Sequence, residues 1–170
     1  MMFGNGRNEN LAMQVGNTLD SYGWMLAIAE SCTGGAVACA VTDIAGSSGW
    51  FERGFVTYSN DAKHEMLDVS QDALARWGAV SEAVVREMVA GALNHSHAQV
   101  ALAVSGIAGP GGGTPDKPVG TVWFAWGTGE GQLVTRLCHF SGDRAEIRTQ
   151  SVGVALQGVL ELLNQVIRVA

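Results

Sequence analysis

Basic side chains are scarce in this sequence, and it has no long hydrophobic run. The 170 residues include 10 lysines and arginines against 16 aspartates and glutamates, a formal net charge of −6. The basic residues form no cluster, whereas binding a nucleic-acid backbone requires a basic face. No segment approaches the roughly 20 apolar residues that cross a bilayer, and the polar N-terminus has no signal-peptide core. We therefore expect a cytoplasmic protein that binds neither nucleic acid nor membrane.

Cysteine and surface charge are also limited. Cys32, Cys39 and Cys138 form no CxxC pair and are odd in number, so we expect neither a disulfide framework nor a metal site. Charged residues make up only 15% of the chain, against 47% apolar residues. We expect one domain over residues 1–170, with residues 1–9 as a flexible N-terminal tail. A surface with so few charged residues is expected to be covered in part by another subunit, which predicts a homo-oligomer, at least a dimer.

Hydrophobic patterning predicts helices that alternate with strands. Helices are expected over residues 10–22, 34–41, 60–66, 81–94 and about 141–169, the third capped by Asn60. Strands are expected over residues 24–29, 51–58, 99–104, 119–127 and 133–140. The glycine-containing loop between the last two strands indicates a β-hairpin, which introduces an antiparallel step. This order predicts an α/β fold, a single three-layer α/β/α domain with a mixed, partly antiparallel sheet.

The stretch AESCTGG, residues 29–35, joins the first expected strand to a helix of small residues. A helix that begins after such a turn has unpaired amide N–H groups and the positive end of its dipole there. Ser31 would therefore act as a nucleophile, with N–H groups near Thr33 to Gly35 stabilising an oxyanion. The alternative is that Ser31 only caps the helix. Cys32 is a second possible nucleophile, but it has no obvious histidine partner.

Ser31 needs a base, and none of the four histidines is well placed to supply one. Lys63 would lie in the first turn of the helix capped by Asn60, close to the end of a strand. Partial burial there would lower its pKa and leave some amine neutral. Tyr58 would relay the proton or orient the lysine. The alternatives are a solvated surface lysine and a tyrosine packed in the core.

The sequence SGIAGPGGG, residues 105–113, follows another apolar strand. Its glycines allow close approach to a phosphate, although it lacks the ending of a P-loop and can be a simple turn. Arg144 adds a fork for phosphate or carboxylate, with a surface salt bridge as the alternative. Ligands collect beyond the carboxyl ends of strands in open α/β sheets, so one shared cleft is expected.

Several of these blocks occur together in a known family. AESCTGG, TDIAGSSGWFERGFVTYSNDAK, GAVSE, SGIAGPGGG with KPVGTVWFAW, and FSGDR resemble the C-terminal domain of the competence/damage-inducible protein A (CinA) family from about Leu11 onward. The resemblance implies a three-layer α/β/α fold and hydrolysis of the carboxamide of nicotinamide mononucleotide. The products would be nicotinic acid mononucleotide and ammonia, a step in pyridine-nucleotide recycling that needs no metal or other cofactor. Longer members carry a molybdopterin-binding-like domain that is not expected here.

The resemblance also implies roles for individual residues. Ser31 would be the nucleophile, with Lys63 and Tyr58 as its activating partners. Substrate-binding positions would be Glu30, Thr33, Gly34, Gly35, Asn60, Ser105, Gly106, Gly109 and Arg144. One rival interpretation is a nucleotide-binding regulatory module in which Ser31 only hydrogen-bonds the ligand. Another is a subunit that docks a partner through Trp24, Trp50 or Trp77.

Overall fold

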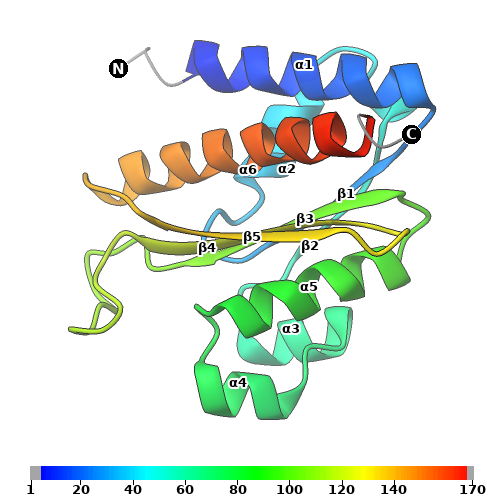
Figure 1. Ribbon diagram of the computed structural model, residues 1–170. Helices are drawn as coiled ribbons and strands as arrows, with labels where there is room; N and C mark the ends of the chain where they lie inside the picture. Colours follow the sequence, from blue (N-terminus) through cyan, green and yellow to red (C-terminus); the bar gives the residue numbers. More distant parts are fainter. Residues whose placement is uncertain (1–4, 168–170) are drawn as a thin grey trace.

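The computed structural model describes residues 5–167 and places one five-stranded sheet between two layers of helices (Figure 1). The strands are β1 (Leu26–Glu30), β2 (Phe51–Val56), β3 (Val100–Gly106), β4 (Thr121–Thr128) and β5 (Leu133–His139). Their order in the sheet is β2-β1-β3-β4-β5. β2 and β3 both run parallel to β1, whereas β4 is antiparallel to its neighbours β3 and β5. The predicted mixed sheet and its hairpin are therefore confirmed.

Helices α1, α2 and α6 cover one face of the sheet, and α3, α4 and α5 cover the other (Figure 1). The helices are α1 (Asn5–Tyr22), α2 (Ala36–Thr42), α3 (Asn60–Leu67), α4 (Gln71–Trp77), α5 (Glu82–Asn94) and α6 (Arg144–Ile167), with a 3-10 turn at Ser47–Gly49. This arrangement confirms the three-layer α/β/α fold. Within residues 5–167, no helix is both long and apolar enough to span a membrane.

The central strands present different side chains to the two helical layers. On β1, Leu26 and Ile28 belong to the core under α1 and α6, whereas Ala27 and Ala29 belong to the core under α5. Successive side chains of a strand point to opposite faces, so the alternation of large and small residues assigns each its face. The small alanines bring α5 close to the sheet, and the larger side chains fill the space beneath the longer α6.

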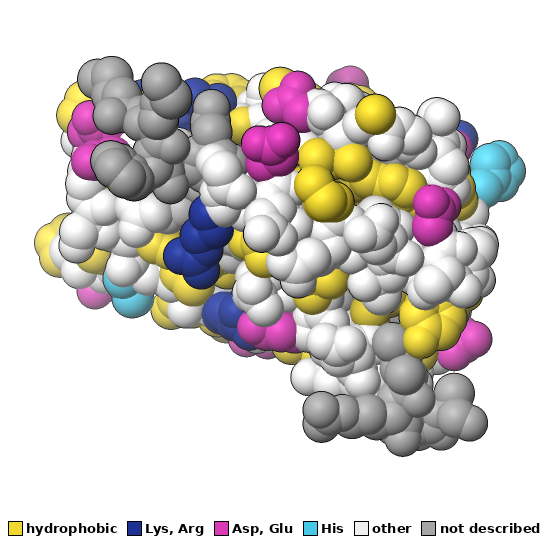
Figure 2. Space-filling model, turned by 90° about the horizontal axis from the view of Figure 1, so that it is seen from above, with side chains coloured by type: hydrophobic (Ala, Val, Ile, Leu, Met, Phe, Trp, Pro, Cys, Tyr) yellow, Lys and Arg dark blue, Asp and Glu magenta, His cyan; other side chains and the backbone are white. Residues whose placement is uncertain are grey.

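The tryptophans named for partner docking are mostly covered. Trp50 is buried and Trp24 is half-buried, because both pack into the core under α1 and α6. Only Trp77 of the three is exposed. Figure 2 looks down on the α1 and α6 layer, where hydrophobic side chains reach the surface in several places between polar ones. The docking interpretation is thus wrong for Trp50.

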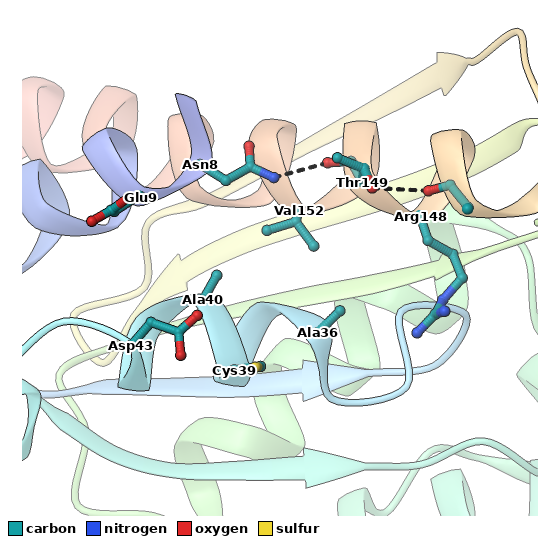
Figure 3. Close-up of a pocket in the computed structure, with 10 residues that line it drawn as sticks. Asn8, Glu9, Ala36, Cys39, Ala40, Asp43, Arg148, Thr149 and Val152 are labelled. Carbon is teal, nitrogen blue, oxygen red and sulfur yellow. Dashed lines mark hydrogen bonds between the residues drawn. The ribbon is translucent and has the colours of Figure 1, made fainter. Parts of the chain in front are cut away.

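The first helix is longer than the sequence pattern predicts. α1 begins at Asn5, so residues 5–9 are helical and the expected tail is wrong for them, while residues 1–4 lie outside the described part. The Asn8 side-chain nitrogen donates a hydrogen bond to the Thr149 carbonyl oxygen at 3.2 Å, which ties this turn of α1 to α6 (Figure 3). That contact is tertiary, so the polar composition of the segment gave no sign of it. The expected end of the last helix near residue 169 also lies outside the described residues.

Two other local predictions need correction. Ser59 caps α3, because its hydroxyl accepts a hydrogen bond from the Ala62 N–H at 3.0 Å, and Asn60 is the first helical residue. Serine and asparagine are both good N-caps, so the adjacent pair is ambiguous in sequence. α4 was not expected at all. It is a short helix capped by Ser70.

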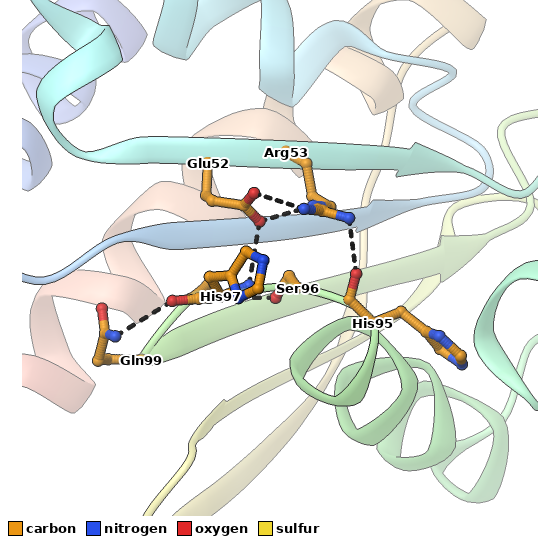
Figure 4. Close-up of polar contacts among 7 residues, drawn as sticks. Glu52, Arg53, His95, Ser96, His97 and Gln99 are labelled. Carbon is orange, nitrogen blue, oxygen red and sulfur yellow. Dashed lines mark hydrogen bonds and ion pairs between the residues drawn. The ribbon is translucent and has the colours of Figure 1, made fainter.

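Polar contacts tie the start of β2 to the segment between α5 and β3 (Figure 4). Arg53 donates hydrogen bonds to both Glu52 carboxylate oxygens and, at 2.9 Å, to the His95 carbonyl oxygen. The Glu52 carboxylate also accepts a bond from the His97 N–H at 3.3 Å. β1, β2 and β3 are parallel, so this cluster lies at the edge of the sheet opposite the carboxyl ends that carry the predicted site.

Candidate active site

Ser31 and Lys63 meet at the carboxyl ends of β1 and β2. The Lys63 Nζ atom lies 3.0 Å from the Ser31 Oγ atom. Ser31 directly follows β1, and its N–H donates a hydrogen bond to the Val104 carbonyl oxygen of β3 at 3.0 Å. Lys63 lies in the first turn of α3, and it is only 1% exposed. The alternative of a solvated surface lysine is therefore wrong.

Main-chain carbonyl groups hold the Lys63 amine in place. Its Nζ atom donates to the Thr57 carbonyl oxygen at 2.8 Å and to the Tyr58 carbonyl oxygen at 3.4 Å. Among the described residues, no carboxylate pairs with it. Burial lowers the pKa of Lys63 from 10.5 to about 8. A lysine of this kind can lose its proton near neutral pH and accept one from the adjacent hydroxyl.

Glu30 has a structural role in the turn that follows β1. Its buried carboxylate accepts hydrogen bonds from the N–H groups of Gly35, Val37 and Ala38 at 2.9–3.1 Å. The side chain of Glu30, not that of Ser31, therefore caps α2. The charge also complements the positive end of the helix dipole. The interpretation of Ser31 as a helix cap is wrong.

The predicted oxyanion donors are only partly available. The Gly34 N–H donates to the Ser31 carbonyl oxygen at 3.0 Å, and the Gly35 N–H donates to Glu30. Both are therefore occupied, which contradicts their expected role. Within the described part of the chain, neither the Cys32 N–H nor the Thr33 N–H donates a hydrogen bond to another residue. These two, which immediately follow Ser31, are the free donors of the turn.

Cys32 and the histidines make poor alternatives. Burial raises the pKa of the Cys32 thiol to about 11, which keeps it protonated at neutral pH. His64 Nδ1 bonds the Val69 carbonyl oxygen at 2.9 Å, and His139 Nδ1 lies 3.4 Å from the Thr121 hydroxyl. His95 and His97 lie at the end of the sheet opposite the carboxyl ends of the parallel strands. In residues 5–167, no three or more His, Cys, Asp or Glu side chains gather as a metal site would require.

A cavity of about 280 Å³ opens over Ser31 and Lys63. Its lining comprises Ser31, Cys32, Tyr58, Lys63, Ala79, Val80, Ser105, Gly106, Ile107, Ala108, Gly109, Gly111, Gly112 and Arg144. The structure thus brings the three predicted segments to one cleft. Of the predicted substrate-binding positions, Glu30, Thr33, Gly34, Gly35 and Asn60 do not line it. An adjoining cavity of about 520 Å³ shares Ala108 and Arg144 with it.

Arg144 links two walls of the cavity. Its guanidinium donates to the Gly109 carbonyl oxygen at 2.8 Å and to the Tyr58 hydroxyl oxygen at 3.1 Å. It forms no ion pair with any described residue, which contradicts the surface salt bridge alternative. The Tyr58 side chain is 61% exposed. The Tyr58 hydroxyl therefore contacts Arg144, while its main-chain carbonyl oxygen accepts a hydrogen bond from the Lys63 amine.

Sequence reasoning missed other members of the site. Ala79 and Val80 precede α5 and reach the cavity, because the Ser105 hydroxyl donates to the Ala79 carbonyl oxygen at 2.8 Å. The GAVSE block was the available signal for this segment. Arg148, one turn after Arg144 on α6, donates to the carbonyl oxygens of Cys32 and Thr33 at 3.2 and 2.8 Å. Only its spacing of four residues from Arg144 pointed to it.

The sequence model of the CinA C-terminal domain matches residues 8–163. The chain belongs to the CinA C-terminal domain family. This CinA domain is 54% identical over 154 residues to the nicotinamide-nucleotide amidohydrolase PncC of Enterobacter agglomerans, a match that covers 91% of this chain and 94% of that protein. It is 57% identical over 147 residues to the protein of the same name from Escherichia coli strain K12, which covers 86% and 89% of the two chains.

Solved structures of the family have the same fold as this CinA domain. The crystal structure of the competence/damage inducible protein CihA from Agrobacterium tumefaciens matches with a TM-score of 0.90 and 45% identity. The match covers 93% of this chain and 96% of that one. A CinA superfamily protein from Klebsiella pneumoniae matches with a TM-score of 0.89 and 41% identity, over 93% and 98% of the two chains.

Proposed function

We propose that this CinA domain hydrolyses the carboxamide of nicotinamide mononucleotide, giving nicotinic acid mononucleotide and ammonia. Relatives named nicotinamide-nucleotide amidohydrolase, 54% and 57% identical over most of the chain, support the substrate class. The observation that carries the chemistry is the 3.0 Å contact between the Lys63 Nζ atom and the Ser31 Oγ atom in a buried setting. We place the reaction in the recycling of pyridine nucleotides in the cytoplasm.

Acylation begins when neutral Lys63 removes the proton from the Ser31 hydroxyl. With a pKa of about 8, about a tenth of the lysine side chains are neutral at pH 7. The Ser31 Oγ atom then bonds to the carboxamide carbon, and the carbonyl electrons move onto oxygen. Free N–H groups of the turn after Ser31 stabilise this oxyanion. As the intermediate collapses, the carbon–nitrogen bond breaks and the Lys63 ammonium returns its proton to the leaving ammonia.

Deacylation uses the same groups in reverse. Lys63, again neutral, takes a proton from a water molecule that attacks the ester carbon of the acyl-enzyme. The second tetrahedral intermediate expels the Ser31 oxygen, which recovers its proton from Lys63. The released product is the carboxylic acid of the pyridine ring. Every proton transfer uses a side chain of this chain, so the proposed cycle needs neither a metal nor a cofactor.

The rest of the nucleotide would extend along the β3–β4 loop. Arg144 borders both the cavity over Ser31 and the adjoining cavity, and its guanidinium suits a phosphate group. The glycines of the loop leave room for close approach of a ribosyl phosphate to the main chain. In this arrangement the pyridine carboxamide points to Ser31, and the phosphate lies near the start of α6.

The proposed function is tested by incubating the purified protein with nicotinamide mononucleotide and measuring both products. We expect ammonia and nicotinic acid mononucleotide in equal amounts, with the chelator EDTA present or absent. Free nicotinamide, which lacks the ribosyl phosphate, serves as the matched control and should turn over far more slowly. Binding of the nucleotide without any ammonia release would contradict the proposal and favour the regulatory-module interpretation.

A further inference from the structure

Arg148 contacts the turn after Ser31 and takes no part in the proposed cycle. It is half-buried at one end of a cavity of about 420 Å³ between α1, α2 and α6. Figure 3 shows its side chain leaving α6 and reaching the turn between β1 and α2. Its Nε and Nη2 atoms donate to the carbonyl oxygens of Cys32 and Thr33. The guanidinium thus holds the two residues that follow Ser31.

The hydrogen bond from Arg148 to the Cys32 carbonyl oxygen fixes the direction of the Thr33 N–H. A trans peptide group is planar, with its C=O and N–H pointing to opposite sides. The N–H in the same peptide group as the Cys32 carbonyl is that of Thr33. Because Arg148 fixes the carbonyl oxygen at 3.2 Å, the Thr33 N–H points away from the guanidinium. A positively charged partner on the carbonyl also polarises the group and makes its N–H a stronger donor.

The hydrogen bond from Arg148 to the Thr33 carbonyl oxygen acts on the Cys32 N–H through one further hydrogen bond. The Thr33 carbonyl, bonded to Arg148 at 2.8 Å, shares its peptide group with the Gly34 N–H. That N–H donates to the Ser31 carbonyl oxygen at 3.0 Å. The Ser31 carbonyl in turn shares its peptide group with the Cys32 N–H. Arg148 is therefore linked to the Thr33 N–H through one peptide group. It is linked to the Cys32 N–H through two hydrogen-bonded peptide groups.

We propose that Arg148 is a positioning residue of the amidase, which orients and polarises the Cys32 and Thr33 N–H groups as oxyanion donors. This inference rests on the proposed function. Burial raises the pKa of the Cys32 thiol and the Glu30 carboxylate raises it further, whereas the positive charges of Arg148 and Lys63 lower it. Arg148 itself touches no reacting atom. It acts on the transition state, in which the carbonyl oxygen becomes negative.

The test compares the parent with Arg148→Met and Arg148→Lys. Losing one oxyanion donor lowers kcat about 10²–10³-fold, and loss of orientation and polarisation alone should lower it about 10–100-fold in Arg148→Met. The value of kcat decides the test, because Arg148 also lines the adjoining cavity of about 520 Å³, so loss of its charge is expected to raise KM for the nucleotide as well. Arg148→Lys keeps the charge but reaches only one carbonyl group, so its kcat should lie between those of the parent and Arg148→Met.

Two further readouts separate this role from a merely structural one. The pH at which the rate is half-maximal should be the same in all three proteins, because Lys63 keeps its own contacts. Asn8→Ala is the matched control. Asn8 lines the same cavity and tethers the same helix, but it does not contact the turn, so kcat should be unchanged. An unchanged kcat in Arg148→Met, or an increase in KM alone, would overturn the inference, and Arg148→Lys decides if Arg148→Met does not fold.

The labelling rate of Ser31 by phenylmethanesulfonyl fluoride provides a test independent of the nucleotide. In this reaction the serine oxygen bonds to sulfur, fluoride leaves, and the proton passes to Lys63. A parent that is labelled faster than Arg148→Met supports the positioning role even if nicotinamide mononucleotide is not turned over, an outcome that refutes only the proposed substrate. Equal labelling rates, or no labelling of the parent, would overturn the positioning role.

Discussion

The amine of Lys63 lies 3.0 Å from the hydroxyl oxygen of Ser31, and both side chains are almost fully withdrawn from solvent. β1 delivers the serine, and α3 delivers the lysine from the end of the neighbouring parallel strand. Without a carboxylate partner to stabilise its charge, the buried amine has a depressed pKa. In the proposed mechanism this pair supplies the base and the nucleophile, in a cavity that no described histidine lines.

The pH dependence of the reaction should follow the protonation of Lys63. Only the neutral amine accepts the serine proton, so kcat/KM should rise with pH and level off above a midpoint near 8. Rates of ammonia release between pH 6 and 9.5 would define this profile. A rate that is constant over the range, or that falls as pH rises, would contradict Lys63 as the base.

The free energy of unfolding should also depend on pH because of the lowered pKa of Lys63. The pKa of Lys63 is about 8 in the folded protein and 10.5 as its ordinary value, so between these values the unfolded chain binds more protons. The free energy of unfolding of the parent should therefore rise relative to Lys63→Met by about 3 kcal/mol from pH 8 to pH 10.5. Urea unfolding of both proteins across this range measures the difference. A difference that stays constant with pH would show that folding does not lower the pKa of Lys63.

Glu30 is expected to stabilise the turn and not the substrate. Its carboxylate accepts three N–H groups at the start of α2, so Glu30→Gln should lower the free energy of unfolding by about 1–3 kcal/mol. Asp43→Asn, the same change at the exposed other end of α2, should alter it by no more than about 0.5 kcal/mol. Equal effects of the two changes in urea unfolding would argue against the capping role.

Tyr58 should matter less than its neighbours in the reaction. Its main-chain carbonyl group orients Lys63, and a phenylalanine keeps that group, while its hydroxyl contacts only Arg144 among the described residues. Tyr58→Phe should therefore lower kcat/KM about tenfold or less, chiefly through KM, because Arg144 loses one anchor. Steady-state kinetics on nicotinamide mononucleotide would show this. A loss as large as that of Lys63→Met would instead support a proton relay through the hydroxyl.

Much of the fold was predictable, because its signals are local. Hydrophobic patterning marked all five strands, and the glycine loop marked the hairpin. The residues beside Ser31 were harder to assign. The sequence AESCTGG predicts a helix start with free N–H groups, but it does not show that the Glu30 side chain folds back onto them. The tether from Asn8 to Thr149 was equally invisible, since it joins residues 141 positions apart.

The site could be predicted as three segments but not as a complete lining. Parallel strands bring their carboxyl ends to one edge, so Ser31, the Tyr58–Lys63 segment and the loop after Ser105 converge by topology. The contributions of Ala79 and Arg148 depend on how separate helices pack against that edge. Such contacts have no period or spacing in the sequence, so only the structure places them.

Comparing ammonia release by the parent, Ser31→Ala and Lys63→Met tests the central claim most directly. The two side chains act as one unit, so each variant should lose at least about 10³-fold in kcat on nicotinamide mononucleotide. Thermal unfolding of each variant serves as the control for folding. A folded Ser31→Ala or Lys63→Met protein that releases ammonia at the parent's rate would contradict the serine–lysine amidase.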